Sequence, residues 1–178
     1  MALRNSYLGN IYYTLLQKFI VPKLKESGLG PNKITIIGGV VSLMVPLGFY
    51  FSPLIGAMLI LVSAIFDSLD GQIARSMGEK KFGAFLDSTV DRVSDFFYLM
   101  GLMIVSGNTS KSLILTFLIF IALVLTLLFS YTKARIEGLG GSCNVGFMER
   151  AKRVIYLIVL SVFIPFFLTA LALFYMGL

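Results

Sequence analysis

The sequence contains no histidine and no tryptophan, and Cys143 is its single cysteine. Without histidine, no imidazole is available as a general base or as a metal ligand. One cysteine excludes a disulfide framework and any zinc site built from several thiolates. Charged residues are also scarce, at 13% against about 25% in an average soluble domain, whereas 57% of the residues are hydrophobic. This balance excludes a disordered chain and argues against a water-soluble globule.

The chain is basic, with a formal net charge of +6 over 178 residues. In a soluble protein, such a balance suggests a nucleic-acid partner. In a chain this apolar it instead indicates positively charged cytoplasmic loops and contact with anionic lipid head groups. We therefore expect membrane lipids as partners and no nucleic acid.

Five apolar stretches indicate membrane spans, because a helix needs about 20 mostly apolar residues to cross the hydrocarbon core. They cover residues 34–51, 53–66, 82–105, 113–132 and 154–178. The last stretch contains Pro165, so it forms either one long tilted helix or two short helices. The sequence predicts an all-α, polytopic integral membrane helical bundle with five clear spans and a possible sixth.

The segment before the first span mixes apolar residues with three lysines between Ile11 and Ser27. This pattern predicts an amphipathic helix that lies on the membrane surface. The alternative is an ordinary solvated helix with one face in the core. The predicted organisation is a juxtamembrane segment, residues 1–30, followed by a transmembrane domain, residues 31–178.

The charges are distributed unequally between the two ends of the spans. If the first span begins after Pro31, Lys111 is the only one of the 15 lysines and arginines that falls on the second side, and all 9 acidic residues fall on the first. The positive-inside rule makes the first side cytoplasmic. We therefore expect a multi-pass protein of the cell membrane whose charged machinery faces the cytoplasm.

Four aspartates flank the short loop between the second and third spans. Asp67 and Asp70 are three residues apart, and Asp87 and Asp91 are four apart, so each pair lies on one helix face. Because the short loop makes the two helices antiparallel neighbours, the four carboxylates can converge. Such a cluster could belong to an ion-coupled transporter, a static salt-bridge lattice or a metal site.

A metal site resolves the charge problem best. Each unpaired carboxylate at membrane depth costs a few kcal/mol, and Arg75 and Arg92 can neutralise two at most. Oxygen ligands without histidine or a usable thiolate suit Mg²⁺ or Mn²⁺. We expect one such ion or a pair.

Residues 67–91 read DSLDGQIARSMGEKKFGAFLDSTVD. They resemble the signature of the CDP-alcohol phosphotransferases, D-x-x-D-G-x-x-A-R, a spacer, and G-x-x-x-D-x-x-x-D, with a spacer one residue shorter than in many members. The resemblance implies a transmembrane catalytic domain in which an acceptor hydroxyl attacks a CDP-linked donor and CMP leaves. It also implies two Mg²⁺ or Mn²⁺ ions and a homodimer.

The resemblance assigns roles residue by residue. The implied metal ligands are Asp67, Asp70, Asp87 and Asp91, and Asp91 is also the implied catalytic base. The implied contacts to the donor nucleotide are Pro31, Asn32, Lys33, Ile34, Thr35, Gly71, Arg75 and Lys80. The alternative for the stretch from Pro31 to Thr35 is an ordinary helix start with proline in its first turn.

A second basic cluster lies between the fourth and last spans, with five cations from residue 133 to residue 153. It serves either as an anchor to anionic lipid or as a phosphate pocket, since arginine binds phosphate in a bidentate manner. The segment SYTKARIEGLG, followed by ER-x-x-R, resembles the branch that makes phosphatidylinositol phosphate. The implied contacts to the acceptor phosphate are Lys133, Arg135, Arg150 and Arg153.

We therefore expect an enzyme that transfers a phosphatidyl or archaetidyl group from a CDP-lipid to an alcohol phosphate, with inositol 1-phosphate as the acceptor. A phosphatidylglycerophosphate synthase that uses glycerol 3-phosphate is the alternative. From a different class, a cation-coupled transporter would use the aspartates as its ion path.

Overall fold

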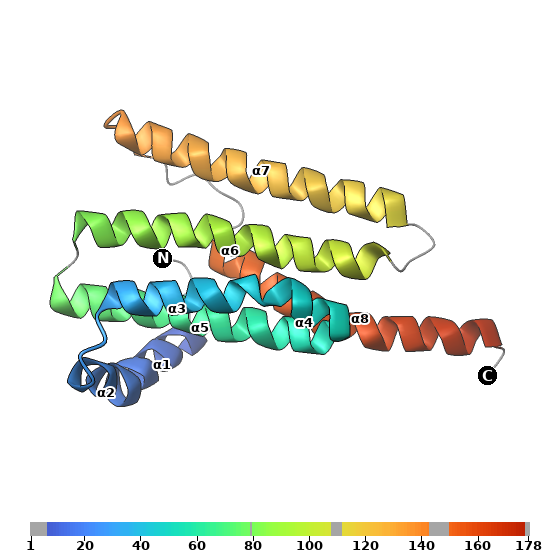
Figure 1. The fold of residues 1–178 in the computed structure, drawn as a ribbon, viewed down its shortest axis with the longest axis horizontal. Helices are drawn as coiled ribbons and strands as arrows, with labels where there is room; N and C mark the ends of the chain where they lie inside the picture. The colour runs from blue at the N-terminus through green and yellow to red at the C-terminus, as the bar shows by residue number, and fades with distance from the viewer. Residues whose placement is uncertain (1–6, 79, 108–111, 143–149, 177–178) are drawn as a thin grey trace.

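The computed structural model describes residues 7–78, 80–107, 112–142 and 150–176, and every regular element in these ranges is a helix (Figure 1). Three short helical segments come first: α1 (Tyr7–Leu15), the π-helical turn η1 (Leu16–Ile20) and α2 (Val21–Glu26). The bundle then consists of α3 (Pro31–Leu43), α4 (Val45–Phe51), α5 (Pro53–Met77), α6 (Lys81–Gly107), α7 (Ser112–Gly138) and α8 (Arg150–Met176). The predicted all-α fold is confirmed for the described residues.

Prolines and glycines set the helix boundaries. Pro31 and Pro53 stand at the starts of α3 and α5, where the missing N–H of proline is not needed. The Ser52 side chain caps α5 by accepting a hydrogen bond from the backbone N–H of Leu54 at 3.2 Å. Gly78 ends α5 with φ at +85°, a conformation that favours glycine. The chain can therefore reverse from α5 into α6 within a few residues.

The helices pack around α5 and α6. The α3 and α4 segments lie against both of these helices, α8 packs on α5, and α7 packs on α6 (Figure 1). The main hydrophobic cluster comprises Val45, Phe49, Ile60, Tyr98, Leu102 and Val154. The Phe49 ring lies so close to Gly56 and Gly101 that an added Cβ would be 2.5 Å and 2.3 Å from it. These two glycines thus let α4 approach α5 and α6.

The N-terminal helices have two apolar surfaces. Leu16 and Val21 are buried in a second cluster with Ile34, Leu69 and Ile73, and the Gln17 amide donates to Gln72 Oε1 at 3.2 Å. Leu15 and Phe19 are 51% and 55% exposed. One face therefore packs on α3 and α5, and large apolar side chains remain uncovered elsewhere.

Three of the described helical stretches are long and apolar enough to cross a membrane: Pro31–Phe51, Pro53–Met77 and Leu113–Gly138. The two other predicted spans coincide with α6 and α8, which have 27 residues each. The α8 helix runs without a break past Pro165. The alternative of two short helices at this position is therefore wrong.

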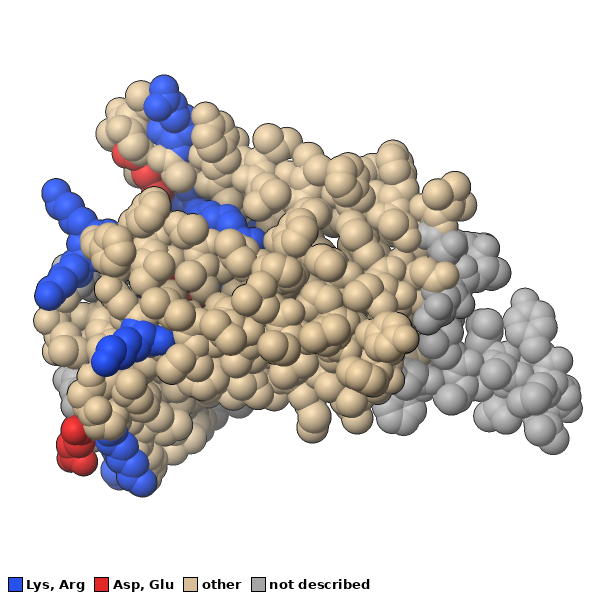
Figure 2. Space-filling view, in the orientation of Figure 1, with Lys and Arg blue, Asp and Glu red and all other residues tan. Residues whose placement is uncertain are grey.

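Charged side chains gather at one end of the molecule. On the face shown in Figure 2, lysine, arginine and acidic residues lie at the left end, and the rest of the described surface there is uncharged. Comparison with Figure 1 places this end where α5 ends and α6 begins. The four aspartates of the motif belong to the same half of these two helices.

Candidate active site

Three carboxylates of the motif meet between α5 and α6. One oxygen from each of Asp67, Asp87 and Asp91 can be chosen so that all three lie within 4.8 Å of one another. All three side chains are only partly buried, so a cation could reach them. The helical spacing thus brings together the groups that it predicted.

Asp70 is the most buried of the four, at 3% exposed, and neither carboxylate oxygen has a hydrogen-bond partner within the described part of the chain. Thr35 lines the same pockets, but its hydroxyl donates to the Pro31 carbonyl oxygen at 3.1 Å. Asp70 lines a small cavity with Asp67 and Asp91. All four carboxylates therefore converge.

Asp67, Asp87 and Asp91 fit a hard divalent cation, and Asp70 lies beside them. A buried carboxylate without a partner is costly, and like charges this close repel each other. The donors are all oxygen, the ligand type that Mg²⁺ and Mn²⁺ prefer. Asp70 supports the fit, because its buried carboxylate oxygens have no hydrogen-bond partner among the described residues and lie beside the other three carboxylates.

A pocket of about 490 Å³ opens beside the cluster, between the start of α3, the end of α5 and the start of α6. Its lining residues are Gly30, Pro31, Asn32, Lys33, Thr35, Asp70, Gly71, Ala74, Arg75, Met77, Gly78, Lys80, Gly83, Ala84 and Asp87. Seven of the eight residues predicted to contact the donor nucleotide are among them. The eighth, Ile34, is 1% exposed and packs in the second hydrophobic cluster.

Small residues keep this pocket open. A Cβ added to Gly83 would lie 3.1 Å from Asn32 Oδ1, and one added to Gly71 would lie 3.5 Å from the Arg75 guanidinium. Lys33, Arg75 and Lys80 supply three positive charges to the lining. The pocket thus combines an open helix N-terminus with cations, an arrangement suited to phosphate groups.

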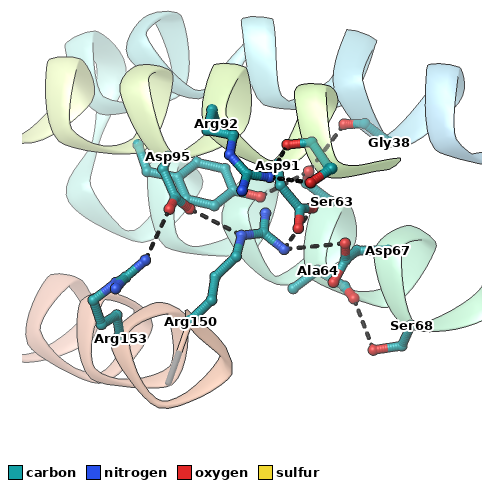
Figure 3. Close-up of polar contacts among 12 residues, drawn as sticks. Gly38, Ser63, Ala64, Asp67, Ser68, Asp91, Arg92, Asp95, Arg150 and Arg153 are labelled. Atoms are coloured by element: carbon teal, nitrogen blue, oxygen red, sulfur yellow. Dashed lines mark hydrogen bonds and ion pairs between the residues drawn. The ribbon is translucent and has the colours of Figure 1, made fainter. Parts of the chain in front are cut away.

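Two arginines of α8 reach the carboxylates (Figure 3). Arg150 Nη1 lies 3.0 Å from Asp67 Oδ1 and 2.8 Å from Asp91 Oδ1, and its Nε donates to Asp95 Oδ1 at 3.2 Å. Arg153 Nη2 donates to the other oxygen of Asp95 at 3.3 Å. Asp95 continues the helix face of Asp91 at a spacing of four, which allows it to lie behind the metal ligands or to pair with Arg92 or a neighbouring helix, and the structure shows pairing with α8.

Lys133 and Arg135 lie elsewhere, near the end of α7. Both are exposed, and Lys133 pairs with Glu137 at 3.9 Å. Within the described residues, no ion pair or hydrogen bond links either of them to the carboxylates or to α8. Of the four cations predicted to hold an acceptor phosphate, the structure brings only Arg150 and Arg153 to the aspartates.

A chain of buried hydrogen bonds joins three helices next to the carboxylates. Tyr98 Oη donates to Ser63 Oγ at 2.8 Å, and Ser63 Oγ donates to the Gly38 carbonyl oxygen at 2.9 Å. These bonds join α6, α5 and α3 within about a turn of Asp67 and Asp95. At the other edge Tyr12 of α1 lies near Ser68, and burial raises the pKa of its phenol. Sequence reasoning identified none of these contacts.

The sequence matches a family model described as CDP-alcohol phosphatidyltransferase over residues 29–178. An archaetidylinositol phosphate synthase of Methanothermobacter thermautotrophicus is 37% identical over 156 residues, which are 86% of this chain and 77% of that protein. A phosphatidylinositol phosphate synthase of Mycobacterium tuberculosis is 34% identical over 157 residues, which are 84% of this chain and 70% of that protein.

The fold is also similar to solved structures of the Mycobacterium tuberculosis phosphatidylinositol phosphate synthase. The form with CDP-DAG bound has a TM-score of 0.68 and 35% identity, over 79% of this chain and 72% of that one. The form in complex with manganese and citrate has a TM-score of 0.69 and 35% identity, over 79% and 68% of the two chains.

Proposed function

Since the chain belongs to the CDP-alcohol phosphatidyltransferase family, we propose that it transfers a phosphatidyl or archaetidyl group from a CDP-lipid to inositol 1-phosphate and releases CMP. The observation that carries this proposal is a carboxylate cluster with a cationic pocket on one side and the arginines of α8 on the other. The relatives named archaetidylinositol phosphate synthase and phosphatidylinositol phosphate synthase favour this acceptor over glycerol 3-phosphate.

The donor nucleotide would occupy the pocket between α3, α5 and α6. Lys33, Arg75 and Lys80 would face its phosphates, and Gly71 would let the diphosphate approach α5. The solved relative with CDP-DAG bound supports a CDP-lipid as the donor. The lipid chains would remain in the bilayer beside the helices.

Asp67, Asp70 and Asp87 would hold Mg²⁺ or Mn²⁺, and Asp91 would be a ligand to a second ion. When bound, the ions neutralise the donor diphosphate and the departing CMP. The relative solved with manganese supports this assignment.

Asp91 would also be the general base. It accepts the proton of the acceptor hydroxyl, whose oxygen then attacks the phosphorus that carries the lipid. A new P–O bond forms, the bond to the bridging oxygen of the diphosphate breaks, and the electron pair leaves with CMP. Arg150 and Arg153 would hold the phosphate that the acceptor already carries.

The proposed membrane arrangement has five spans: α3 with α4, then α5, α6, α7 and α8. A helix of 27 residues is about 40 Å long, enough to cross the hydrocarbon core with some tilt. The exposed apolar side chains of α1 and η1 would rest on the membrane surface. The charged end would face the cytoplasm, and the active form would be a homodimer, as the family resemblance implies.

The test is a panel of acceptors with purified protein and one CDP-lipid at a time. CMP release should require Mg²⁺ or Mn²⁺, stop in EDTA and be fastest with inositol 1-phosphate. A preference for glycerol 3-phosphate would show that the proposed acceptor is wrong and that the proposed type of reaction is right. Cation flux in liposomes without CMP release from any acceptor would favour the transporter alternative and overturn the proposal.

A further inference from the structure

Asp95 differs from the four aspartates of the motif because two arginines, one at each carboxylate oxygen, contact it. Its side chain is 10% exposed, and each carboxylate oxygen accepts a hydrogen bond from a different arginine of α8 (Figure 3). It does not belong to the group of carboxylates that could share a metal ion. With both oxygens engaged, Asp95 is a partner of arginines rather than a metal ligand.

The two arginines are left with unused donors. Arg153 contacts Asp95 through Nη2, and its side chain is 24% exposed. A guanidinium group has five N–H donors, so one that is fixed through a single nitrogen still presents others to a second anion. Asp95 is the only carboxylate that Arg153 contacts within the described residues, so the two unbound nitrogens of this guanidinium can face a second anion. The arrangement suits a phosphate that binds in front of α8.

Helix α6 sets the position of Arg150 and Arg153 relative to Asp91, the proposed general base. Asp95 is one helical turn beyond Asp91, and Arg150 contacts both of them, at 3.2 Å and 2.8 Å. A phosphate held by Arg150 and Arg153 would therefore lie next to Asp91. If Asp95 lost its charge, Arg153 would keep no anionic partner in the described structure, and Arg150 would be drawn entirely to Asp67 and Asp91.

We propose that Asp95 is a positioning residue for the acceptor: it holds Arg150 and Arg153 where they bind the acceptor phosphate beside Asp91. This inference rests on the proposed function, because it requires an alcohol phosphate as the acceptor. Asp95 itself touches neither substrate, and its effect is transmitted through the two arginines.

The test compares wild type, Asp95→Asn and Asp95→Glu as purified full-length protein with Mg²⁺ present. Binding of inorganic phosphate is measured first, by its effect on thermal unfolding, because this readout does not depend on turnover. Loss of charge-assisted hydrogen bonds should weaken phosphate binding in Asp95→Asn by about 10- to 150-fold. The KM for inositol 1-phosphate should rise by a similar factor, with the KM for CDP-diacylglycerol within about twofold of wild type. Asp95→Glu, which keeps the charge, should recover part of both losses.

Tyr98→Phe is the matched control. It removes a buried hydrogen bond from the same helix, three residues further on, and leaves the ion pairs of Arg150 and Arg153 with the aspartates in place. A purely structural role for Asp95 predicts that Asp95→Asn behaves like Tyr98→Phe, with a lower unfolding temperature and unchanged phosphate binding and acceptor KM. That result would overturn the inference.

The outcomes separate the inference from the function on which it rests. If none of the alcohol phosphates tested makes the wild type release CMP, the proposed function fails, whatever Asp95→Asn does to phosphate binding. If the wild type is active and Asp95→Asn keeps its acceptor KM, the inference alone fails. Should Asp95→Asn not fold, Asp95→Glu decides: phosphate affinity equal to wild type contradicts the inference, and a loss of threefold or more supports it.

Discussion

Asp70→Asn is expected to make the metal-free protein more stable and the enzyme inactive. The wild-type carboxylate is 3% exposed, and neither oxygen has a hydrogen-bond partner within the described residues. A buried polar group without a partner costs about 1–3 kcal/mol, and more if it is charged. Asparagine has the same shape without the charge. The amide is also without a partner but carries no charge, so we expect the free energy of unfolding in EDTA to rise by about 1 kcal/mol, or roughly 2–4 °C in Tm for a chain of this size.

In the presence of metal, the wild type should become more stable than Asp70→Asn. An ion present at 100 times its Kd stabilises the folded wild type by about 2.7 kcal/mol. The amide that replaces the carboxylate in Asp70→Asn offers only one neutral oxygen, so most of this gain should disappear. Since the chain has no tryptophan, unfolding is followed by circular dichroism, in EDTA and in a series of Mg²⁺ concentrations.

Asp95→Asn is the matched comparison, because it removes the same charge from a carboxylate whose oxygens are both engaged. It should lower Tm in EDTA, since two partly buried guanidinium groups lose their partner. Two results would refute the reasoning about Asp70: a lower Tm of Asp70→Asn in EDTA, or a Mg²⁺-dependent rise in Tm equal to that of wild type.

Three further changes test other parts of the structure. Asp91→Asn should slow the chemical step by about 10²–10⁴-fold with little change in CDP-lipid binding, measured by single-turnover kinetics, and loss of donor binding would make Asp91 primarily a metal ligand. Arg153→Ala should raise the acceptor KM by about 10- to 150-fold, and Arg153→Lys should restore it in part. Lys133→Ala should leave the acceptor KM unchanged, because Lys133 pairs with Glu137 on α7. An acceptor KM that is the same in all three variants would indicate that the cations only anchor the protein to the membrane. Gly101→Ala should lower the free energy of unfolding by about 1–3 kcal/mol, because the new Cβ would lie 2.3 Å from the Phe49 ring. Gly107→Ala is the control, since its Cβ would enter open space and the change should be neutral or stabilising. Equal Tm values for the two variants would contradict this packing.

The sequence was sufficient for features that depend on local spacing. The five apolar runs correspond to helices, namely α3 with α4, α5, α6, α7 and α8, and three of these stretches are long and apolar enough to span a membrane. The convergence of Asp67, Asp70, Asp87 and Asp91 followed from helical periodicity and one short loop. The pocket next to them contains seven of eight predicted residues, because the motif and the start of α3 meet there.

Contacts between distant segments could not be predicted in the same way. Asp95 meets Arg150 and Arg153 across 55 and 58 residues, and no local pattern specifies which face of α8 points toward α6. Lys133 and Arg135 are close to these arginines in sequence, yet α7 packs on α6 and carries them away from the cluster. The proximity of cations in sequence was a poor guide because each helix end is placed by its own packing.

The position of Arg150 affects how tightly the carboxylates can hold a divalent ion. Its Nη1 occupies the space between Asp67 and Asp91, so the side chain and a divalent ion would compete for the same oxygens. An ion that binds these oxygens therefore has to displace the guanidinium, so the affinity of the site for metal includes the cost of breaking two ion pairs.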